Sequence, residues 1–336
     1  MAKLVGTFFH SHGGTTSMPG SEWRKRRLAR PVREDVPIED DETNIGKADQ
    51  THRDFTILRE KVAELKTDVL VCFSDDQLEC FDFNNYPAFA VYVGDEFRKR
   101  PAREGGPTGR PDFAGVGQAG RHAPAGSTFK GHRELAVAIL TGTMQRGFDP
   151  AFCMDMPKPD RGLASGVVRT AEELTNWELP VVPVMMNLYF APQPTAYRCY
   201  QFGKAVREVI DEYPEDVRVA IVGSGGLWHT PGMPGAWLNV DFDHKTLDLL
   251  KNGDARGMAE HFDSYVIPTN DTSQNTSKRD RNITGMPQQG GPALGTRETC
   301  AWIAAAAASE GHETTWIDYI PVWASPVGHA FAYCEL

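Results

Sequence analysis

The stretch "TDVLVCFSDDQLECF", residues 67–81, decides the fold class. Its apolar run is typical of a buried strand, and the polar residues Asp75, Asp76 and Gln77 fall where that strand should end in a loop. The preceding "FTILREKVAELK" has apolar residues at helical spacing. A helix leading into a buried strand indicates an α/β protein, and enzymes of that class hold their chemistry at strand ends. Three interpretations follow: a metal site with an unusual ligand, a site that has lost its metal, or a polar strand end.

The alternation of strands and helices continues along the chain. Further strands are expected at "KLVGTFF", "YPAFAVYV", "LPVVPVMMNLYF" and "VRVAIVGSGG", and two closing strands near the C-terminus. Helices are expected at "HRELAVAILTGTMQRG", "AYRCYQFGKAVREVIDEY" (with Thr195 as its N-cap), "HKTLDLLKNG" and "TRETCAWIAAAAASEG". The sequence thus predicts one α/β domain over residues 1–336, with a central mostly parallel or mixed sheet flanked by helices. A loop is expected from the first strand to about residue 50, and two large loop insertions are expected at about 94–130 and 268–293.

Composition disfavours several classes of protein. The chain has 35 Lys and Arg against 45 Asp and Glu, a formal charge of −10, whereas a nucleic-acid binder normally carries a basic face. No apolar run approaches the roughly 20 residues of a membrane span. The six cysteines are scattered without a CxxC pair, so neither a zinc knuckle nor a disulfide framework is indicated. We therefore expect a cytoplasmic protein that binds neither nucleic acid nor membrane.

Four further residues could carry chemistry. His10 and His12 in "FFHSHGG" are two apart at a strand end, which suits a metal, although one buried and one exposed histidine would give the same pattern. His229 follows the glycine turn in "AIVGSGGLWH", where it could act as a general acid/base or be structural. Glu298 falls in the first turn of a predicted helix, either favoured there by the helix dipole or binding a metal. A carboxylate with two neutral ligands would complete a facial triad for non-haem Fe(II).

Seven segments of the chain, in order, resemble the class III extradiol ring-cleavage dioxygenases of the protocatechuate 4,5-dioxygenase β-subunit type. They are "VGTFFHSHGG", "TDVLVCFSDDQLECFDFNNYPAFAV", "VVPVMMNLYFAPQPTAYRCYQFGKAVREVI", "VAIVGSGGLWH", "DFDHKTLDLL", "ETCAWIAAA" and "SPVGHAFAY". By position, the resemblance implies that His12 and Glu298 are Fe(II) ligands and that His229 is the acid/base.

The second ligand position departs from that family. The family has an Asn-Asp-His run ten residues before the proline of the next strand, and counting back ten from Pro87 gives Gln77. An amide oxygen can bind a metal, but more weakly than imidazole binds Fe(II). We therefore expect Gln77 to lie at or next to the metal, with His10 and Asp76 as alternative ligands.

A second departure is Arg161, in "PKPDRGLASG", where the family usually has a histidine that lines its pocket. A guanidinium there could bind a carboxylate or phenolate of the substrate, or could form a structural salt bridge.

The resemblance implies a non-haem Fe(II)-dependent dioxygenase that uses O₂ to open the ring of a catechol-like hydroxylated aromatic, with aromatic acids among the candidates. Two alternatives remain: an enzyme of the same fold with an altered metal or reaction, and a non-catalytic partner subunit of a heteromeric dioxygenase. A homo-oligomer is expected, with a second subunit as a further option. Retention of His12, His229 and Glu298 together argues against a non-catalytic subunit.

Overall fold

A computed structural model describes residues 1–101, 122–274 and 286–336 of the chain. The strands are β1 (Lys3–His10), β2 (Val69–Asp75), β3 (Phe89–Tyr92), β4 (Glu96–Arg98), β5 (Thr128–Lys130), β6 (Ala151–Cys153), β7 (Val181–Met186), β8 (Arg218–Ser224), β9 (Thr315–Val322) and β10 (Val327–Glu335). The α-helices are α1 (Trp23–Leu28), α2 (Asp41–Glu64), α3 (Arg133–Gln145), α4 (Ser165–Leu174), α5 (Ala196–Glu212), α6 (Val240–Lys251), α7 (Ala255–Asp263) and α9 (Thr299–Ala308). Short 3₁₀ turns are η1 (Gly14–Ser17), η2 (Gly20–Glu22), η4 (Thr272–Gln274) and η5 (Leu294–Glu298).

Eight strands form one mixed sheet in the order β6-β3-β7-β2-β8-β1-β10-β9, which confirms the predicted α/β class. The four central strands β7, β2, β8 and β1 are parallel. β10 and β9 add an antiparallel pair at one edge, and β3 is antiparallel to β7 at the other. Because the central strands share a direction, their carboxyl ends meet at one edge of the sheet, where a site can be assembled.

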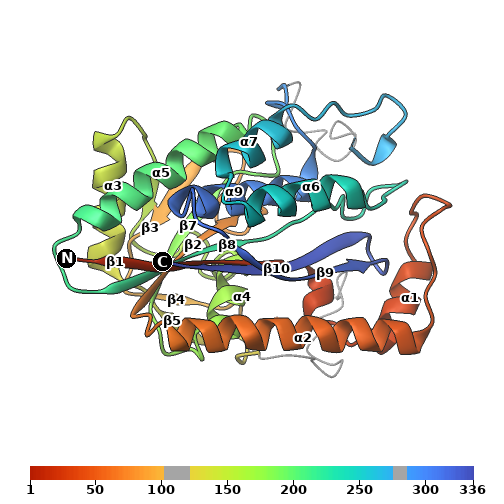
Figure 1. The fold of residues 1–336 in the computed structure, drawn as a ribbon, viewed down its shortest axis with the longest axis horizontal. Helices are drawn as coiled ribbons and strands as arrows, with labels where there is room; N and C mark the ends of the chain where they lie inside the picture. The colour runs from red at the N-terminus through yellow and green to blue at the C-terminus, as the bar shows by residue number, and fades with distance from the viewer. Residues whose placement is uncertain (102–121, 275–285) are drawn as a thin grey trace.

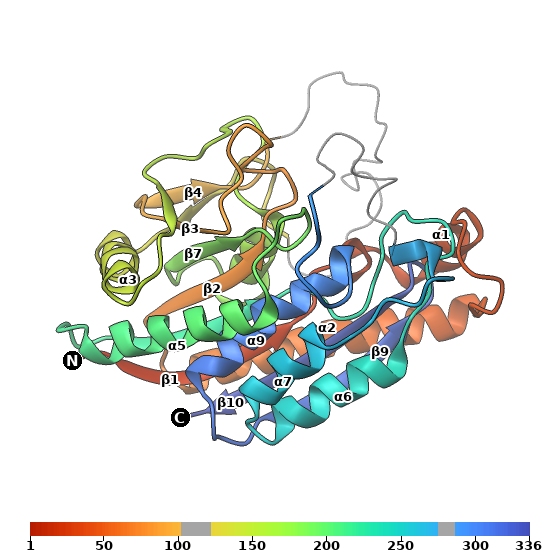
Figure 2. The same ribbon diagram turned by 90° about the horizontal axis from the view of Figure 1, so that it is seen from above.

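Helices cover both faces of the sheet (Figures 1 and 2). α5, α9, α6 and α7 lie on one face, and α2 and α4 lie on the other. The alternation of side chains along β2 separates the two cores: Val69, Val71 and Phe73 pack with the α5/α9 layer, whereas Leu70 and Cys72 pack with the α2/α4 layer. A strand buried on both faces must be apolar throughout, which explains the continuous run in the sequence.

The two helices next to the central strands approach each other closely. α9, with the sequence "TCAWIAAAAA", is buried along its whole length between the sheet and α5. A Cβ at Gly203 of α5 would lie 1.9 Å from the carbonyl oxygen of Ala304, so only glycine fits at this crossing. Small residues therefore allow α9 to lie deep in the fold, and Glu298, the residue directly before α9, is thereby placed at the sheet edge.

One of the three predicted loops needs correction. The loop expected up to about residue 50 was wrong, because α2 begins at Asp41, where the side chain of Asp40 accepts a hydrogen bond from the N–H of Thr43. The insertion expected at 94–130 contains β4 and β5, which pair as a small antiparallel sheet, while residues 102–121 of it lie outside the described residues. The insertion at 268–293 contains η4, and residues 275–285 of it are also outside the described part.

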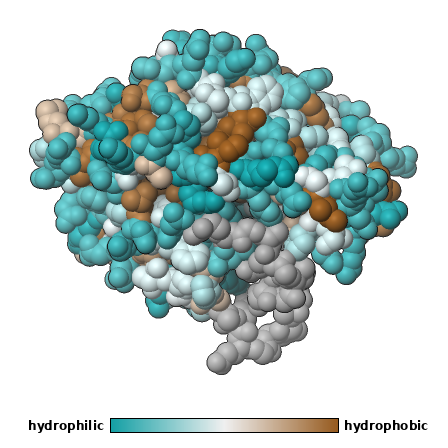
Figure 3. Space-filling model, turned by 60° about the horizontal axis from the view of Figure 1, so that its bottom comes forward, coloured by the Kyte–Doolittle hydropathy of each residue, from teal (hydrophilic) through white to brown (hydrophobic). Residues whose placement is uncertain are grey.

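The surface agrees with the composition. On the face drawn in Figure 3, hydrophobic residues form small groups separated by hydrophilic ones. Among the described residues, no helix is long and apolar enough to cross a membrane. All six cysteines are free thiols, as their scattered positions predicted.

Candidate metal centre

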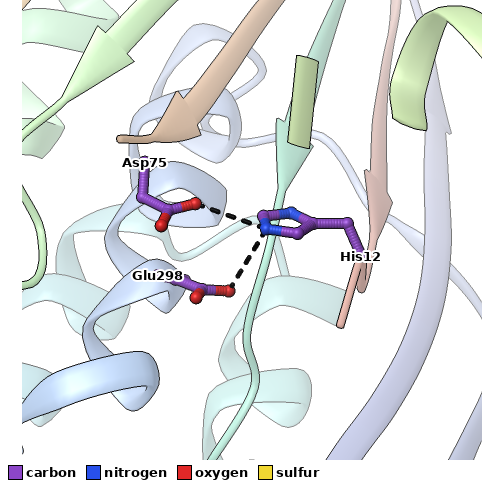
Figure 4. Close-up of side chains that lie close together, drawn as sticks. All are labelled: His12, Asp75 and Glu298. Carbon is purple, nitrogen blue, oxygen red and sulfur yellow. Dashed lines mark ion pairs between the residues drawn. The ribbon is translucent and has the colours of Figure 1, made fainter. Parts of the chain in front are cut away.

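Three side chains meet at the carboxyl edge of the central strands (Figure 4). His12 lies two residues after β1, Asp75 is the last residue of β2, and Glu298 directly precedes α9. One donor atom of each lies within 4.8 Å of the donor atoms of the other two. His12 Nε2 is 3.3 Å from Asp75 Oδ1 and 3.8 Å from Glu298 Oε2. The three side chains are each at most 5% exposed, so the cluster is screened from bulk water.

The imidazole of His12 is held with one nitrogen directed into the cluster. Its Nδ1 is 3.0 Å from the hydroxyl of Ser224, the last residue of β8. That hydroxyl donates its single proton to the carbonyl oxygen of Gly166, so its oxygen accepts from His12 Nδ1–H. Burial opposes a charge on His12, but Glu298 and Asp75 outweigh it and raise the pKa of the ring to about 9. Nε2 therefore holds a proton between the two carboxylates, and a metal ion binding there would displace it.

Both oxygens of Glu298 are engaged by the chain. Oε2 accepts a hydrogen bond of 2.8 Å from the backbone N–H of Gly226, and Oε1 accepts one of 3.2 Å from the amide nitrogen of Gln77. Oε1 also lies 3.4 Å from Nε2 of His229. Burial opposes the charge of Glu298, but His229 and His12 outweigh it and hold the pKa of this carboxyl below its usual range.

Among the described residues, Asp75 is the member of the cluster with an unpaired carboxylate oxygen. Its Oδ2 is buried and, within the described part of the chain, forms no hydrogen bond. Burial, followed by the charge of Glu298, raises the pKa of the Asp75 carboxyl above its ordinary value. Within the described part of the chain, neither carboxylate forms an ion pair with a Lys or Arg. Two carboxylates and one imidazole are a donor set that fits a divalent cation favouring oxygen and imidazole ligands.

His229 stands beside the cluster at the end of a glycine turn. The turn needs glycine because Gly225 and Gly226 have φ angles of 127° and 66°. Nδ1–H of His229 donates to the carbonyl oxygen of Leu227 at 2.8 Å, which directs Nε2 toward Glu298. Burial lowers the pKa of His229, but the charge and hydrogen bond of Glu298 outweigh it and raise the pKa above its ordinary value. The ring can therefore hold a proton at Nε2 near neutral pH.

The structure brings together four of the residues singled out in the sequence: His12, Gln77, His229 and Glu298. His10 is elsewhere, because Nε2 is 2.9 Å from the hydroxyl of Thr170 and Nδ1 is 3.1 Å from the carbonyl oxygen of Ser11.

Two further candidates also lie outside the cluster. Asp76 accepts hydrogen bonds from the backbone N–H groups of Cys80 and Phe81 and so closes the turn after β2. Arg161 lies in the turn before α4, where its N–H donates to the carbonyl oxygen of Lys158 at 2.8 Å and its side chain is half-buried.

Asp75 and Ser224 are the site residues that sequence reasoning missed. Asp75 was recognised as part of a polar strand end, but not as a metal ligand. Its signal was available, since position 75 ends a strand and lies two residues before Gln77. Ser224 carried no such signal, because a serine before glycines is common in turns.

Comparison with known proteins identifies the family of the chain. Residues 36–266 match the family model "Catalytic LigB subunit of aromatic ring-opening dioxygenase". This match contains Asp75, Gln77 and His229, whereas His12 and Glu298 lie outside it and join the site through the geometry described above.

Curated relatives match parts of the chain. A gallate dioxygenase of Pseudomonas putida is 37% identical over 127 residues, covering 38% of this chain and 37% of the relative. A 2,3-dihydroxyphenylpropionate/2,3-dihydroxicinnamic acid 1,2-dioxygenase of Photorhabdus laumondii is 25% identical over 54% of this chain and 49% of its own length. The protein of the same name from a Mycobacterium species is 28% identical over 57% and 51%, respectively. The alignments thus span about half or less of these relatives.

A solved structure of an uncharacterized Escherichia coli protein, JW3007, covers 98% of this chain with a TM-score of 0.42 and 11% identity, a likeness too low to bear on the site. The family match is decisive, because it extends over well over half of the 336 residues. The protein belongs to the LigB family of aromatic ring-opening dioxygenase catalytic subunits, the class III extradiol group that its sequence resembles.

Proposed function

We propose that this protein is a non-haem Fe(II)-dependent extradiol-type dioxygenase that opens the ring of a catechol-like hydroxylated aromatic with O₂. The observation that carries the proposal is the convergence of His12, Asp75 and Glu298 on one buried point with His229 beside them. The relatives named as gallate and dihydroxyphenylpropionate dioxygenases support an aromatic substrate that bears neighbouring hydroxyl groups.

His12 and Glu298 would hold the metal through Nε2 and a carboxylate oxygen. When bound, Fe(II) supplies the Lewis acidity that favours the deprotonated diol and the open positions at which the diol and O₂ meet. The chain fixes its own ligands in advance: Ser224 orients His12, and Gly226 and Gln77 orient Glu298. Such supporting hydrogen bonds restrict the ligands to one geometry and therefore reduce the entropy lost on binding.

His229 would be the acid/base. The carbonyl of Leu227 fixes its Nδ1–H, so the exchangeable proton is held at Nε2, on the side of Glu298. There the ring can accept a proton from a substrate hydroxyl and return it later in the reaction. When the charge of Glu298 is shared with a cation, its effect on His229 weakens, and the pKa of the ring moves back toward its ordinary range.

Gln77 and Arg161 would act around the metal. Gln77 adjoins the metal site through its contact with Glu298. Arg161 is proposed to bind an anionic group of the substrate, since it lies four residues before Ser165, where α4 begins, and Gly166 of α4 touches the ring of His12. Arg161→Lys should then raise KM for an aromatic acid while leaving metal content unchanged, because lysine keeps the positive charge but lacks the planar guanidinium group that binds a carboxylate with two hydrogen bonds.

The buried charges also bear on the alternative of a metal-free partner subunit. Two carboxylates out of water cost several kcal/mol each unless a cation compensates them. A subunit without a metal would gain stability by losing Asp75, because burial and the charge of Glu298 oppose its ionised form, so the presence of Asp75 supports a metal-binding protein. A same-fold enzyme with another metal or reaction stays the second candidate, because the third ligand differs from the family pattern.

The test is reconstitution with Fe(II) under anaerobic conditions, followed by measurement of O₂ uptake with catechol, gallate and 2,3-dihydroxyphenylpropionate. We expect one Fe(II) per chain and uptake accompanied by the absorbance of a ring-opened product. His229→Ala should keep the iron and lose most turnover, whereas His12→Ala should lose the iron. His10→Gln is the control, because His10 bonds Thr170 outside the cluster. Iron binding without uptake on any diol would favour the second candidate, and loss of iron in His229→Ala would make that residue a ligand.

We further propose that the protein assembles as a homo-oligomer, as the family resemblance implies. Light scattering of the purified protein would give its mass, and a second subunit would be indicated if the isolated chain bound iron but turned over only in the presence of a partner.

A further inference from the structure

We infer that Asp75, and not Gln77, supplies the third protein ligand of the metal, and that Gln77 positions Glu298. The inference rests on the proposed function only in assuming that a divalent cation binds at this site. It assigns a carboxylate where the resemblance led us to expect histidine or an amide.

The side chain of Asp75 is placed as a ligand would be. Oδ1 lies 3.3 Å from Nε2 of His12, and the two side chains point toward each other and toward Glu298 in Figure 4. Oδ2 is buried and has no hydrogen-bond partner in the described part of the chain. An unpaired carboxylate oxygen in the interior is costly, and a cation between these three donors would remove that cost.

Gln77 directs the NH₂ group of its amide, and not the oxygen, at the cluster. Its contact with Glu298 is through the NH₂ group, at 3.2 Å from Oε1. An ionised carboxylate only accepts hydrogen bonds, so the amide must direct nitrogen, and not oxygen, at Glu298. Since an amide nitrogen has no lone pair to give to a cation, Gln77 in this orientation fixes Glu298 and is not itself a ligand.

The two remaining alternatives are occupied elsewhere. The carboxylate of Asp76 accepts from the backbone N–H groups of Cys80 at 2.7 Å and Phe81 at 3.2 Å. Both nitrogens of His10 contact protein groups outside the cluster. Asp75 is therefore the one candidate among those considered that combines proximity to His12 with an unused donor atom.

The change has a chemical consequence. Two carboxylates and a neutral imidazole offset the charge of a divalent cation fully, whereas two imidazoles and one carboxylate leave it with a net positive charge. Carboxylate ligands suit Mn(II) and other hard cations better than imidazole does. We therefore expect the site to bind Mn(II) as well as Fe(II), and to bind both through Asp75.

The test is anaerobic titration of the full chain with Fe(II), and with Mn(II) followed by its electron paramagnetic resonance signal. Asp75→Asn should weaken both ions at least 100-fold, because it removes a charged ligand. Gln77→Ala should weaken them only about 10-fold, the usual effect of losing a group that supports a ligand. Asp76→Asn is the matched control, a neighbouring buried carboxylate with its oxygens already bonded, and it should change affinity less than threefold. Near-normal affinity in Asp75→Asn together with a 100-fold loss in Gln77→Ala would overturn the inference.

A second measurement separates loss of a ligand from loss of the fold. Without metal, Asp75→Asn should melt at the same temperature as the wild type or a few degrees higher, because it removes one of two neighbouring buried carboxylates and leaves Glu298 to pair with His12. Addition of Mn(II) should raise the melting temperature of the wild type and leave that of Asp75→Asn unchanged. A metal-free Asp75→Asn that melts well below the wild type would show a structural role and overturn the inference. The double variant Asp75→Asn/Gln77→His, with two imidazoles and one carboxylate, should regain Fe(II) binding. If it does not, a histidine at position 77 cannot replace Asp75 as the third ligand, which would count against the inference.

Failure of this inference differs from failure of the proposed function. A wild type that binds Fe(II) through Asp75 but cleaves no diol keeps the inference and removes the function. A wild type that cleaves diols with Gln77 as a ligand keeps the proposed function and refutes the inference. A wild type that binds neither Fe(II) nor Mn(II) refutes both.

Discussion

Replacement of Gly166 by alanine should weaken metal binding and turnover while leaving the protein folded. Gly166 is the second residue of α4 and packs directly against the ring of His12. A Cβ at this position would lie 2.6 Å from Cε1 and 2.7 Å from Nδ1 of His12, and 2.1 Å from Oγ of Ser74. The serine hydroxyl can rotate away, because it has no hydrogen-bond partner among the described residues. The imidazole cannot adjust without leaving Ser224, to which it is hydrogen-bonded.

The size of the effect follows from these distances. Carbon atoms in contact normally lie about 3.5–4 Å apart, so the ring of His12 must retreat by about 1 Å. A displacement of about 1 Å at a catalytic centre can cost about 100-fold in rate, and we expect losses of about 10- to 100-fold in Fe(II) affinity and in kcat/KM. The free energy of unfolding should change much less. Alanine gains about 1 kcal/mol over glycine within a helix, which partly offsets an overpacking cost of about 1–3 kcal/mol.

Gly46→Ala is the matched control, because Gly46 lies in α2 with nothing within 4 Å of an added Cβ. It should stabilise the protein by about 0.5–1 kcal/mol and leave metal binding unchanged. Anaerobic iron titration, O₂ uptake and denaturant unfolding of both variants provide the comparison. If Gly166→Ala binds iron and turns over within twofold of the wild type, His12 is not held in a fixed position by α4, and the reasoning fails.

Three other changes test separate features of the structure. Ser224→Ala removes the acceptor for His12 Nδ1–H and should lower Fe(II) affinity about 10-fold in an anaerobic titration, whereas an unchanged affinity would show that the ring needs no such support. Burial raises the pKa of the Asp243 carboxyl to about 8, despite hydrogen bonds from Tyr319 and from the N–H of Trp228. Because the pKa of this group is higher in the folded than in the unfolded state, its contribution to stability is complete below about pH 4 and is lost as the pH rises through 8. Denaturant unfolding should therefore show a loss of about 2–3 kcal/mol between pH 6 and pH 9 that Asp243→Asn abolishes, and equal slopes in both proteins would exclude this group as the cause. Thr195→Ala removes the N-cap of α5 and should lower the free energy of unfolding by about 1 kcal/mol in the same assay without changing iron content; a change below about 0.3 kcal/mol would mean that the cap contributes little.

The fold could be predicted where apolar patterning was strong. Strands buried on both faces, such as Val69–Asp75 and Val181–Met186, are mostly apolar, and the sequence placed the start of each within two positions. The first half of α2 was missed because its buried stripe includes Asn44 and Thr51, which a hydrophobicity pattern does not detect. α4 was missed for a different reason: its apolar stripe is interrupted by Arg169 and the buried Glu172 and Glu173.

The site was predictable in composition but not in arrangement. The resemblance pointed to His12, His229 and Glu298, which the fold brings together from opposite ends of the chain. Spacing along the strand placed His10 beside His12, yet β1 ends at His10 and His12 lies beyond the strand. The relation of Asp75 to Gln77 could not be read from spacing, because it depends on which end of an amide faces Glu298.

The position of β1 in the sheet has a consequence for biosynthesis. β1 lies between β8 and β10, so both of its hydrogen-bonded neighbours come from residue 218 onward. At about 5–20 residues per second, a ribosome needs roughly 10–40 s to proceed from the end of β1 to the start of β8, and during that time the backbone groups of β1 have no partner strand. A nascent chain with an exposed apolar strand is prone to aggregation, and pairing across so long a separation folds slowly. His12 therefore meets Glu298 only after translation has passed residue 298, so the complete centre can bind metal only after that point.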